Sequence, residues 1–356
     1  MNKFYIILRL IKVIIRINQF NNVHSVYHRQ AKRLVKKITF PFNLENVPQI
    51  PANAKLKMQW YMAEFIYVCE NFNRLIDQRS TSEQRRTYLL SGALGAMCDM
   101  IIDDIEMDVE RIQLLKRPLL KFEYENEVEK LYVACYHAFF NSLEEDIKER
   151  TIQYYELLFD AQLRSKQQFD PNITRKEVDE ICKEKCGYSM LFLRAIVNGK
   201  INSLEKEAWF ELGAFIQYCN DAQDLYKDLQ KKLRTFASVR LDLETIAIDI
   251  DKQKTLAFAL VKKTPFQKEK KDSFLLTLYV MHIGILSKLH AFSRICNFNF
   301  SFEKFLSKSK KELRSKITPI SLFSYVLPRV INYQYESVEA PIQFKYNLRN
   351  TSTTKK

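Results

Sequence analysis

The stretch Tyr88–Asp108, YLLSGALGAMCDMIIDDIEMD, is the part of the sequence that decides the fold. Apart from Asp99, residues 89–102 are almost continuously apolar, and a helix of this composition is buried on nearly every side. Asp99 and Asp103 are four residues apart, so both carboxylates project from one face of a helix, roughly 6 Å apart along its axis. Like charges on a buried face repel each other. The stretch therefore predicts a core helix that holds a divalent cation, or one in which Asp99 has a Lys or Arg partner and the later acids form a solvated helix end.

Two glycines interrupt this helix one and two turns before Asp99. Gly92 and Gly95 lower the helix propensity of the segment, so their presence needs a packing or binding reason. We expect them either to let a neighbouring helix approach closely or to leave room for a ligand beside the acids.

A second acidic segment lies in Leu212–Phe236, LGAFIQYCNDAQDLYKDLQKKLRTF. Asn220, Asp224 and Asp228 recur every four residues and so form one polar ridge along a helix. The apolar residues upstream predict that this helix also enters the core. Mg²⁺ prefers oxygen ligands and is usually held by one or two carboxylates together with substrate phosphates. The two segments therefore predict Mg²⁺ sites that are completed by a diphosphate.

Composition favours an all-α fold, a single large helical bundle. The 356 residues include 6 glycines and 9 prolines, too few for many short strands, and 47% are hydrophobic. We see no internal repeat and no run of alternating strand pattern. Helices are expected at residues 56–77, 83–107, 123–147, 149–168, 174–199, 204–233, 242–262, 271–293 and 301–315.

The positive charge is concentrated near the N-terminus. Of the formal net charge of +14, residues 1–55 carry +9, from ten Lys and Arg against Glu45. Such charge suits a nucleic acid or an anionic membrane surface. No zinc-finger spacing, RNA-binding aromatic signature or basic helix-turn-helix accompanies it, so we expect no nucleic-acid partner.

The first twenty residues predict an amphipathic helix, because Arg9, Lys12 and Arg16 share one face. These charges argue against a membrane-spanning helix. The helix is compatible with peripheral contact with a membrane or with packing on the domain. We divide the chain into this helix and a proline-containing linker (1–54), a helical domain (55–330) and a polar tail (331–356).

The seven cysteines predict reduced thiols rather than a disulfide framework. Their number is odd, their spacing is irregular and no secretory signal with a cleavage site precedes them. Cys182 and Cys186 lack the companions of a zinc site. We expect a cytoplasmic protein, one that is compatible with a peripheral position at a membrane.

At the two acidic segments the chain resembles the class I isoprenoid synthases, which include trans-prenyltransferases, squalene and phytoene synthases and class I terpene cyclases. The second helix of the squalene and phytoene synthases has a pattern that Gly213, Gln217, Asn220, Asp224 and Asp228 follow without a gap. Read against the chain-elongating enzymes, the same helix has Asn220 in place of the first Asp of their motif.

The first motif of the squalene and phytoene group, D-x-x-x-D-D, matches Asp99, Asp103 and Asp104. The match to the elongating enzymes is weaker here, because Asp108 is one residue late and Lys116-Arg117 replaces a double arginine. The subfamily therefore stays open.

The resemblance implies a helical bundle with a central cavity, three Mg²⁺ ions and a prenyl diphosphate substrate. It implies catalytic roles for Asp99, Asp103, Asp224 and Asp228. The metal ligands would be Asp99, Asp103 and Asp104 on one side and Asn220, Asp221, Asp224 and Asp228 on the other. Lys185, Arg194 and Lys231 are the candidates for binding the diphosphate, each with the alternative of a solvated helix face. Phe65, Tyr67, Phe192 and Phe215 are expected to line the cavity or to belong to the core.

The function we expect first is that of a class I terpene synthase, which ionises a prenyl diphosphate and cyclises or rearranges the cation. The alternative within the same fold is a trans-prenyl diphosphate synthase or a condensing enzyme of the squalene and phytoene type. An alternative of another class is a catalytically inactive, membrane-associated helical binding protein.

Overall fold

The computed structural model describes residues 26–27, 29–33, 54–105, 107–119, 121–197, 201–240, 242–309 and 312–313. All regular secondary structure in these residues is helical, which confirms the prediction of an all-α fold. The predicted N-terminal amphipathic helix, most of the linker and the C-terminal tail lie outside the described residues.

Most of the helices lie where the hydrophobic pattern predicts them. They are α2 (Ala54–Leu75), α3 (Ser82–Asp99), α4 (Val109–Leu115), α5 (Glu127–Phe140), α6 (Glu145–Arg164), α7 (Arg175–Ile196), α8 (Ser203–Gln230), α9 (Leu243–Lys263), α10 (Lys268–Ile295) and α11 (Phe302–Leu306). A π-helical turn, Met100–Asp104, follows α3, and a 3₁₀ turn, Ser165–Phe169, follows α6. The seven-residue helix α4 was not predicted.

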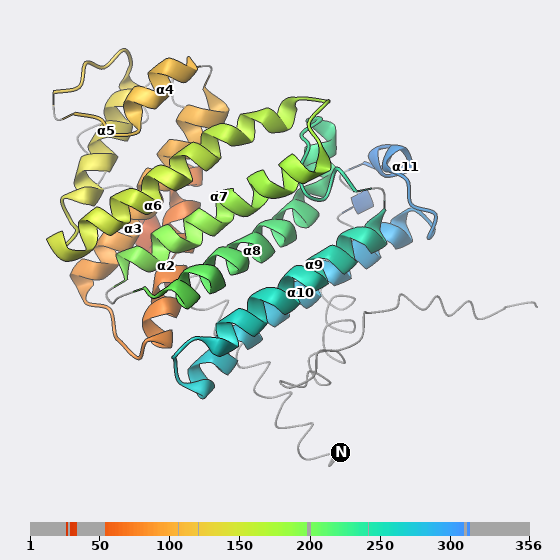
Figure 1. Cartoon of the computed structure of the whole chain (residues 1–356). Helices are drawn as coiled ribbons and strands as arrows, with labels where there is room; N and C mark the ends of the chain where they lie inside the picture. Colours follow the sequence, from red (N-terminus) through yellow and green to blue (C-terminus); the bar gives the residue numbers. More distant parts are fainter. Residues whose placement is uncertain are drawn as a thin grey trace, which may run out of the picture.

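The helices form one bundle in which chain neighbours are mostly spatial neighbours. Helices α6, α7, α8 and α9 lie side by side in this order, and α10 packs against α9 and α8 (Figure 1). Helix α2 pairs with α3 and also contacts α7 and α10, while α3 contacts α5. Helices α3 and α8, which carry the two acidic segments, are therefore connected through α2 and α7.

Two glycines allow the helices around the centre of the bundle to approach closely. A Cβ atom on Gly92 would lie 2.4 Å from the Cα atom of Met62 in α2, and one on Gly213 would lie 2.3 Å from the carbonyl oxygen of Cys186 in α7. At Gly92 the close-approach reading is therefore right. Gly95 instead faces the side chain of Phe65, about one turn closer to Asp99.

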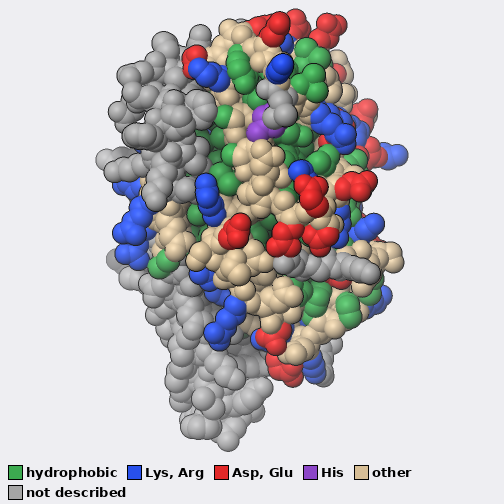
Figure 2. Space-filling model, turned by 90° about the vertical axis from the view of Figure 1, so that its left-hand side faces the viewer, with side chains coloured by type: hydrophobic (Ala, Val, Ile, Leu, Met, Phe, Trp, Pro, Cys, Tyr) green, Lys and Arg blue, Asp and Glu red, His purple; other side chains and the backbone are tan. Residues whose placement is uncertain are grey.

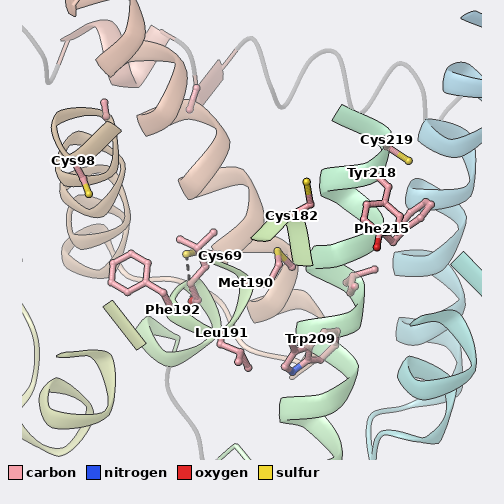
Figure 3. Packing of buried hydrophobic residues seen from close by; sticks show 14 of the residues in the cluster. Cys69, Cys98, Cys182, Met190, Leu191, Phe192, Trp209, Phe215, Tyr218 and Cys219 are labelled. Atoms are coloured by element: carbon pink, nitrogen blue, oxygen red, sulfur yellow. Dashed lines mark hydrogen bonds between the residues drawn. The ribbon is translucent and has the colours of Figure 1, made fainter. Parts of the chain in front are cut away.

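The core is continuous and rich in aromatic and sulfur-containing side chains. Figure 3 shows Cys69 of α2 and Phe192 of α7 between the helix layers, with the Cys69 thiol donating to the carbonyl oxygen of Leu193. Trp209 of α8 is fully buried and packs edge-on against Phe72. All seven cysteines are free, and six of them are buried.

Charge is balanced over the helical body. Residues 1–55 and 314–356 carry net charges of +9 and +5, so residues 56–313 contain equal numbers of acidic and basic side chains. On the face drawn in Figure 2, acidic and basic side chains lie among hydrophobic ones. Within the described residues, α10 is the one helix whose length and apolar composition would allow it to cross a membrane, and half of that stretch is buried in the bundle.

Candidate active site

A pocket of about 160 Å³ lies between five helices, α2, α3, α6, α7 and α8. It is lined by Tyr61, Phe65, Leu94, Gly95, Cys98, Asp99, Tyr155, Leu158, Gln162, Lys185, Cys186, Ser189, Phe192 and Gln217. Gly92 lets α3 approach α2, and Gly213 lets α8 approach α7. These two glycines therefore set the spacing within two pairs of the helices that surround the pocket.

The lining changes from polar to apolar along the pocket. Asp99, Gln162 and Lys185 come from three different helices and lie together, since the Gln162 amide donates to Asp99 and the Lys185 ammonium acts on the same carboxylate. Two turns further along α6 and α7 lie Tyr155 and Phe192, which are almost completely buried. The pocket thus has a charged outer end and an apolar, aromatic inner end.

The acid pair at the outer end is held by hydrogen bonds and an ion pair. The Nε2 atom of Gln162 donates to Oδ1 of Asp99 at 3.0 Å and to Oδ2 of Asp103 at 2.9 Å. The Nζ atom of Lys57, from α2, lies 2.5 Å from Oδ2 of Asp99. This contact agrees with the alternative in which Asp99 has a basic partner, and it leaves the divalent cation a prediction.

The backbone changes its winding at this point. Helix α3 ends at Asp99, and in the π-helical turn that follows the Ile105 N–H donates to the carbonyl oxygen of Met100 at 3.1 Å. π-turns inside helices are frequent at functional sites. The prediction of a regular helix over 83–107 was wrong here, because hydrophobic periodicity does not reveal one additional residue in a turn.

The two carboxyls have different proton affinities. Burial would raise the pKa of Asp99, but the ammonium groups of Lys185 and Lys57 outweigh it and hold that pKa below its usual value. Asp103 is exposed on one side, yet desolvation of its carboxyl and the charge of Asp99 raise its pKa to about 6. Burial and the nearby Asp99 raise the pKa of the Tyr61 phenol well above its usual value.

The second acidic segment lies on α8 and divides between a buried and an exposed face. Asp221 is buried, and its carboxylate accepts hydrogen bonds from Gln217 (2.7 Å), from the Phe236 backbone N–H (3.0 Å) and from the Cys182 thiol (3.3 Å). Burial raises its pKa. Asn220 is exposed. Asp221 is therefore placed as a structural carboxylate that also orients Gln217 in the pocket.

Asp224 and Asp228 continue along α8 beyond the pocket lining. The Asp224 side chain is 38% exposed and lies 3.4 Å from the Nζ atom of Lys227. Asp228 is buried and accepts a hydrogen bond from the Thr235 hydroxyl at 3.1 Å, and burial raises its pKa to about 7. Lys231 is exposed just past the end of the helix.

The donor set of the acid pair fits a divalent cation. One oxygen of Asp99 and one of Asp103 lie within 3.0 Å of the same Gln162 nitrogen, so these two carboxylates would hold a Mg²⁺ ion, which prefers oxygen ligands. Among the described side chains, no group of three or more His, Cys, Asp or Glu comes together as a complete metal site. A bound ion would therefore need further oxygens, such as those of a diphosphate.

No protein-family model matches the sequence, and no curated protein sequence matches it. Among solved structures the chain is similar to a geranyltransferase from Legionella pneumophila. The TM-score is 0.48 and the identity 14%, over 75% of this chain and 98% of the other. The assignment of the site therefore rests on its own geometry.

The structure corrects the prediction for Arg194. This side chain is 2% exposed, donates to Glu205 Oε2 at 3.0 Å and to the Val197 carbonyl oxygen at 3.3 Å, and does not line the pocket. It lies nine residues beyond Lys185, about 13 Å along α7. Arg194 is therefore a structural ion-pair partner, whereas Lys185 lines the pocket.

The aromatic candidates also divide into two groups. Phe65 and Phe192 line the pocket. Phe215 packs against Phe258 and His282 on the other side of α8, and Tyr67 packs against the core without lining the pocket. The alternative that an aromatic side chain belongs to the core is thus correct for two of the four.

Four residues that have a role in the site were missed in the sequence. Lys57, Tyr61, Tyr155 and Gln162 carry no motif that marks them. One signal was available on α2, where Lys57, Tyr61 and Phe65 recur every four residues and so share one face. No signal was available for Gln162, because its role depends on how α6 packs against α3.

Proposed function

We propose that this chain is an enzyme that acts on a prenyl diphosphate, ionising it with the help of Mg²⁺ as class I isoprenoid synthases do. The observation that carries this proposal is the pocket with an acid pair and Lys185 at its outer end and aromatic side chains at its inner end. A prenyl diphosphate has the same polarity, with a charged head and an apolar tail.

In the proposed reaction the bond between the allylic carbon and the diphosphate oxygen breaks, and the electron pair leaves with the diphosphate. Bound Mg²⁺ would supply charge neutralisation of that leaving group. Asp99 and Asp103 are the ligands that the geometry supports, with Asp104, Asn220, Asp221, Asp224 and Asp228 as proposed further ones. Asp221 is the least suited of these, because its three hydrogen bonds already occupy it.

The remaining residues of the pocket act on the two products of ionisation. Lys185 at the outer end would attract the departing diphosphate, with Lys231 as a further proposed contact. Phe65, Tyr155 and Phe192 surround the space where the allylic cation would form. They exclude water and stabilise positive charge through their ring faces.

The size of the pocket favours transfer of a short prenyl group over cyclisation of a long one. An apolar cavity of roughly 150 Å³ holds a six-carbon ring. A pocket of about 160 Å³ therefore takes about one five-carbon unit unless side chains move. Cyclisation needs a chain of several units folded inside the pocket, whereas transfer needs only the reacting end. We therefore place prenyl transfer before the terpene synthase reaction.

The test is release of inorganic pyrophosphate with Mg²⁺ from dimethylallyl, geranyl, farnesyl and geranylgeranyl diphosphates, each with and without isopentenyl diphosphate. Release that needs isopentenyl diphosphate and is fastest with the shortest allylic substrates supports transfer. A cyclic product from one substrate alone supports the terpene synthase reading, and a product of twice the substrate's length supports condensation. Asp99→Asn is the matched control and should remove most of the release in each case.

The alternative of an inactive binding protein is favoured by one observation, the ion pair that already compensates Asp99. A protein of that kind would be stabilised thermally by a prenyl diphosphate, equally with and without Mg²⁺, and would release no pyrophosphate. Stabilisation that depends on Mg²⁺ and is lost in Asp99→Asn would contradict it.

A further inference from the structure

The Asp99 carboxylate is occupied on both oxygens in this structure. Oδ1 accepts the Gln162 amide at 3.0 Å, and Oδ2 lies 2.5 Å from the Lys57 ammonium. The side chains of Lys57 and Asp99 are 23% and 17% exposed, so water screens their attraction only partly. Lys57 therefore competes with any metal ion that would bind Oδ2 of Asp99.

An ammonium group and a metal ion compete for one carboxylate, because each is a cation that needs the same oxygen lone pairs. Gln162 does not compete in this way, since a neutral amide donor adds no net charge. The positive charge of Lys185 also attracts the carboxylates of Asp99 and Asp103 and acts to lower the pKa of each. The acid pair of the free protein is thus charge-compensated by the chain's own lysines.

We propose that Lys57 is an internal counter-ion that keeps Asp99 closed to Mg²⁺ until a diphosphate is present. This inference rests on the proposed function and specifies that Mg²⁺ binds Asp99 only together with a diphosphate. A metal ion alone gains one or two carboxylate oxygens but has to displace a lysine. A metal ion that arrives with a diphosphate gains phosphate oxygens as well, and the displaced ammonium then faces the negative charge of the diphosphate.

The position of Lys57 on its helix fits this exchange. Lys57, Tyr61 and Phe65 are spaced by four residues, and both Tyr61 and Phe65 line the pocket. Lys57 therefore lies on the pocket side of α2, at its outer end. A long, flexible side chain at this position can move away from Asp99 and still contact a diphosphate bound at the outer end of the pocket.

The experiment measures Mg²⁺ affinity directly, by calorimetry in the absence of any substrate, for the parent chain and for Lys57→Met. Methionine keeps a long, unbranched side chain without the charge. We expect Lys57→Met to bind Mg²⁺ about tenfold more tightly or better, because the competing cation is gone. Adding inorganic pyrophosphate should raise Mg²⁺ affinity strongly in the parent and much less in the variant.

Two further variants make the outcome specific. Lys254→Met removes an ion pair of similar burial, between Lys254 Nζ and Asp251 Oδ1 at 2.6 Å, away from the pocket, and should leave Mg²⁺ affinity unchanged. Lys57→Arg keeps the charge and should keep the low affinity, even if Lys57→Met does not fold. Thermal melting of each variant reports whether it folds.

An affinity for Mg²⁺ alone that is equal in the parent, Lys57→Met and Lys57→Arg overturns the inference. If the parent then still binds Mg²⁺ together with pyrophosphate, the proposed function stands and only the role of Lys57 is lost. If no variant binds Mg²⁺ even with pyrophosphate, both proposals fail.

Discussion

Replacing Gly213 by alanine tests how closely α7 and α8 must approach to form the pocket. The added Cβ atom would lie 2.3 Å from the Cys186 carbonyl oxygen and 2.6 Å from the Gly187 backbone nitrogen. Non-bonded heavy atoms prefer about 3.5–4.0 Å, so the two helices would have to separate by about 1 Å. These neighbours are backbone atoms, which cannot rotate away as a side chain can.

The expected loss of stability follows from two opposing effects. Overpacking of a core costs about 1–3 kcal/mol, and alanine regains about 1 kcal/mol of helix propensity relative to glycine. Because backbone must move here, we expect the upper end of this range and a net loss of about 2 kcal/mol. For a domain of this size that lowers Tm by about 3 °C.

Gly284 in the middle of α10 is the matched control. Nothing lies within 4 Å of a Cβ atom built on it, so Gly284→Ala should gain about 0.5–1 kcal/mol of stability from helix propensity alone. Urea unfolding of both variants measures the two values. Equal effects of the two substitutions, or a stabilising Gly213→Ala, would refute the close approach of α7 and α8, the helices that bring Lys185 and Gln217 to the pocket.

Three further outcomes are expected. Arg194→Met should destabilise the fold by about 3–5 kcal/mol because it leaves Glu205 buried without its partner, and the double variant with Glu205→Met should recover much of that loss in urea unfolding. Asp228 has a folded-state pKa raised to about 7 by burial, so without Mg²⁺ the folded chain holds a proton that the unfolded chain loses near pH 4. The contribution of Asp228 to the free energy of unfolding should therefore fall by about 3 kcal/mol as pH rises from about 4 to 7. Asp228→Asn should remove this part of the slope, to which Asp103 and Asp221 also contribute, whereas Asp224→Asn should not. Phe192→Leu should cost about 1–2 kcal/mol and shift pyrophosphate release toward longer allylic substrates, and an unchanged preference would mean that Phe192 does not limit the chain.

Most of the fold could be predicted because it follows from local pattern. The spacing of apolar residues set the helices, and Thr81 and Thr174 begin α3 and α7 as N-caps with a capping box. The short helix α4 escaped prediction since seven residues hold too little periodicity to recognise. The predicted helix 123–147 ends seven residues later than α5, which ends at Phe140 with Asn141 as its C-cap.

The candidate site could be predicted only in part because some of its contacts are tertiary. Asp99 and Asp103 share one helix, so their spacing was informative. The spacing could not identify the cation beside Asp99, because Lys57 lies 42 positions earlier and reaches Asp99 through the packing of α2 on α3. Arg194 was chosen as a diphosphate-binding candidate for the same reason, since its partner Glu205 belongs to the next helix.

The distribution of the thiols gives the pocket a reporter of its own. Cys98 and Cys186 both line the pocket, but Cys186 is half-buried, whereas Cys98 and the other five cysteines are buried. Thiol reagents attack the thiolate, and burial raises the pKa of Cys186 to about 12, so alkylation of the native protein will be slow. The rate at Cys186 will nevertheless record whether the pocket is filled, while alkylation of the five thiols outside the pocket will record transient opening of the bundle. A single labelling time course, read by mass spectrometry, can therefore separate ligand occupancy from loss of packing in every variant described above.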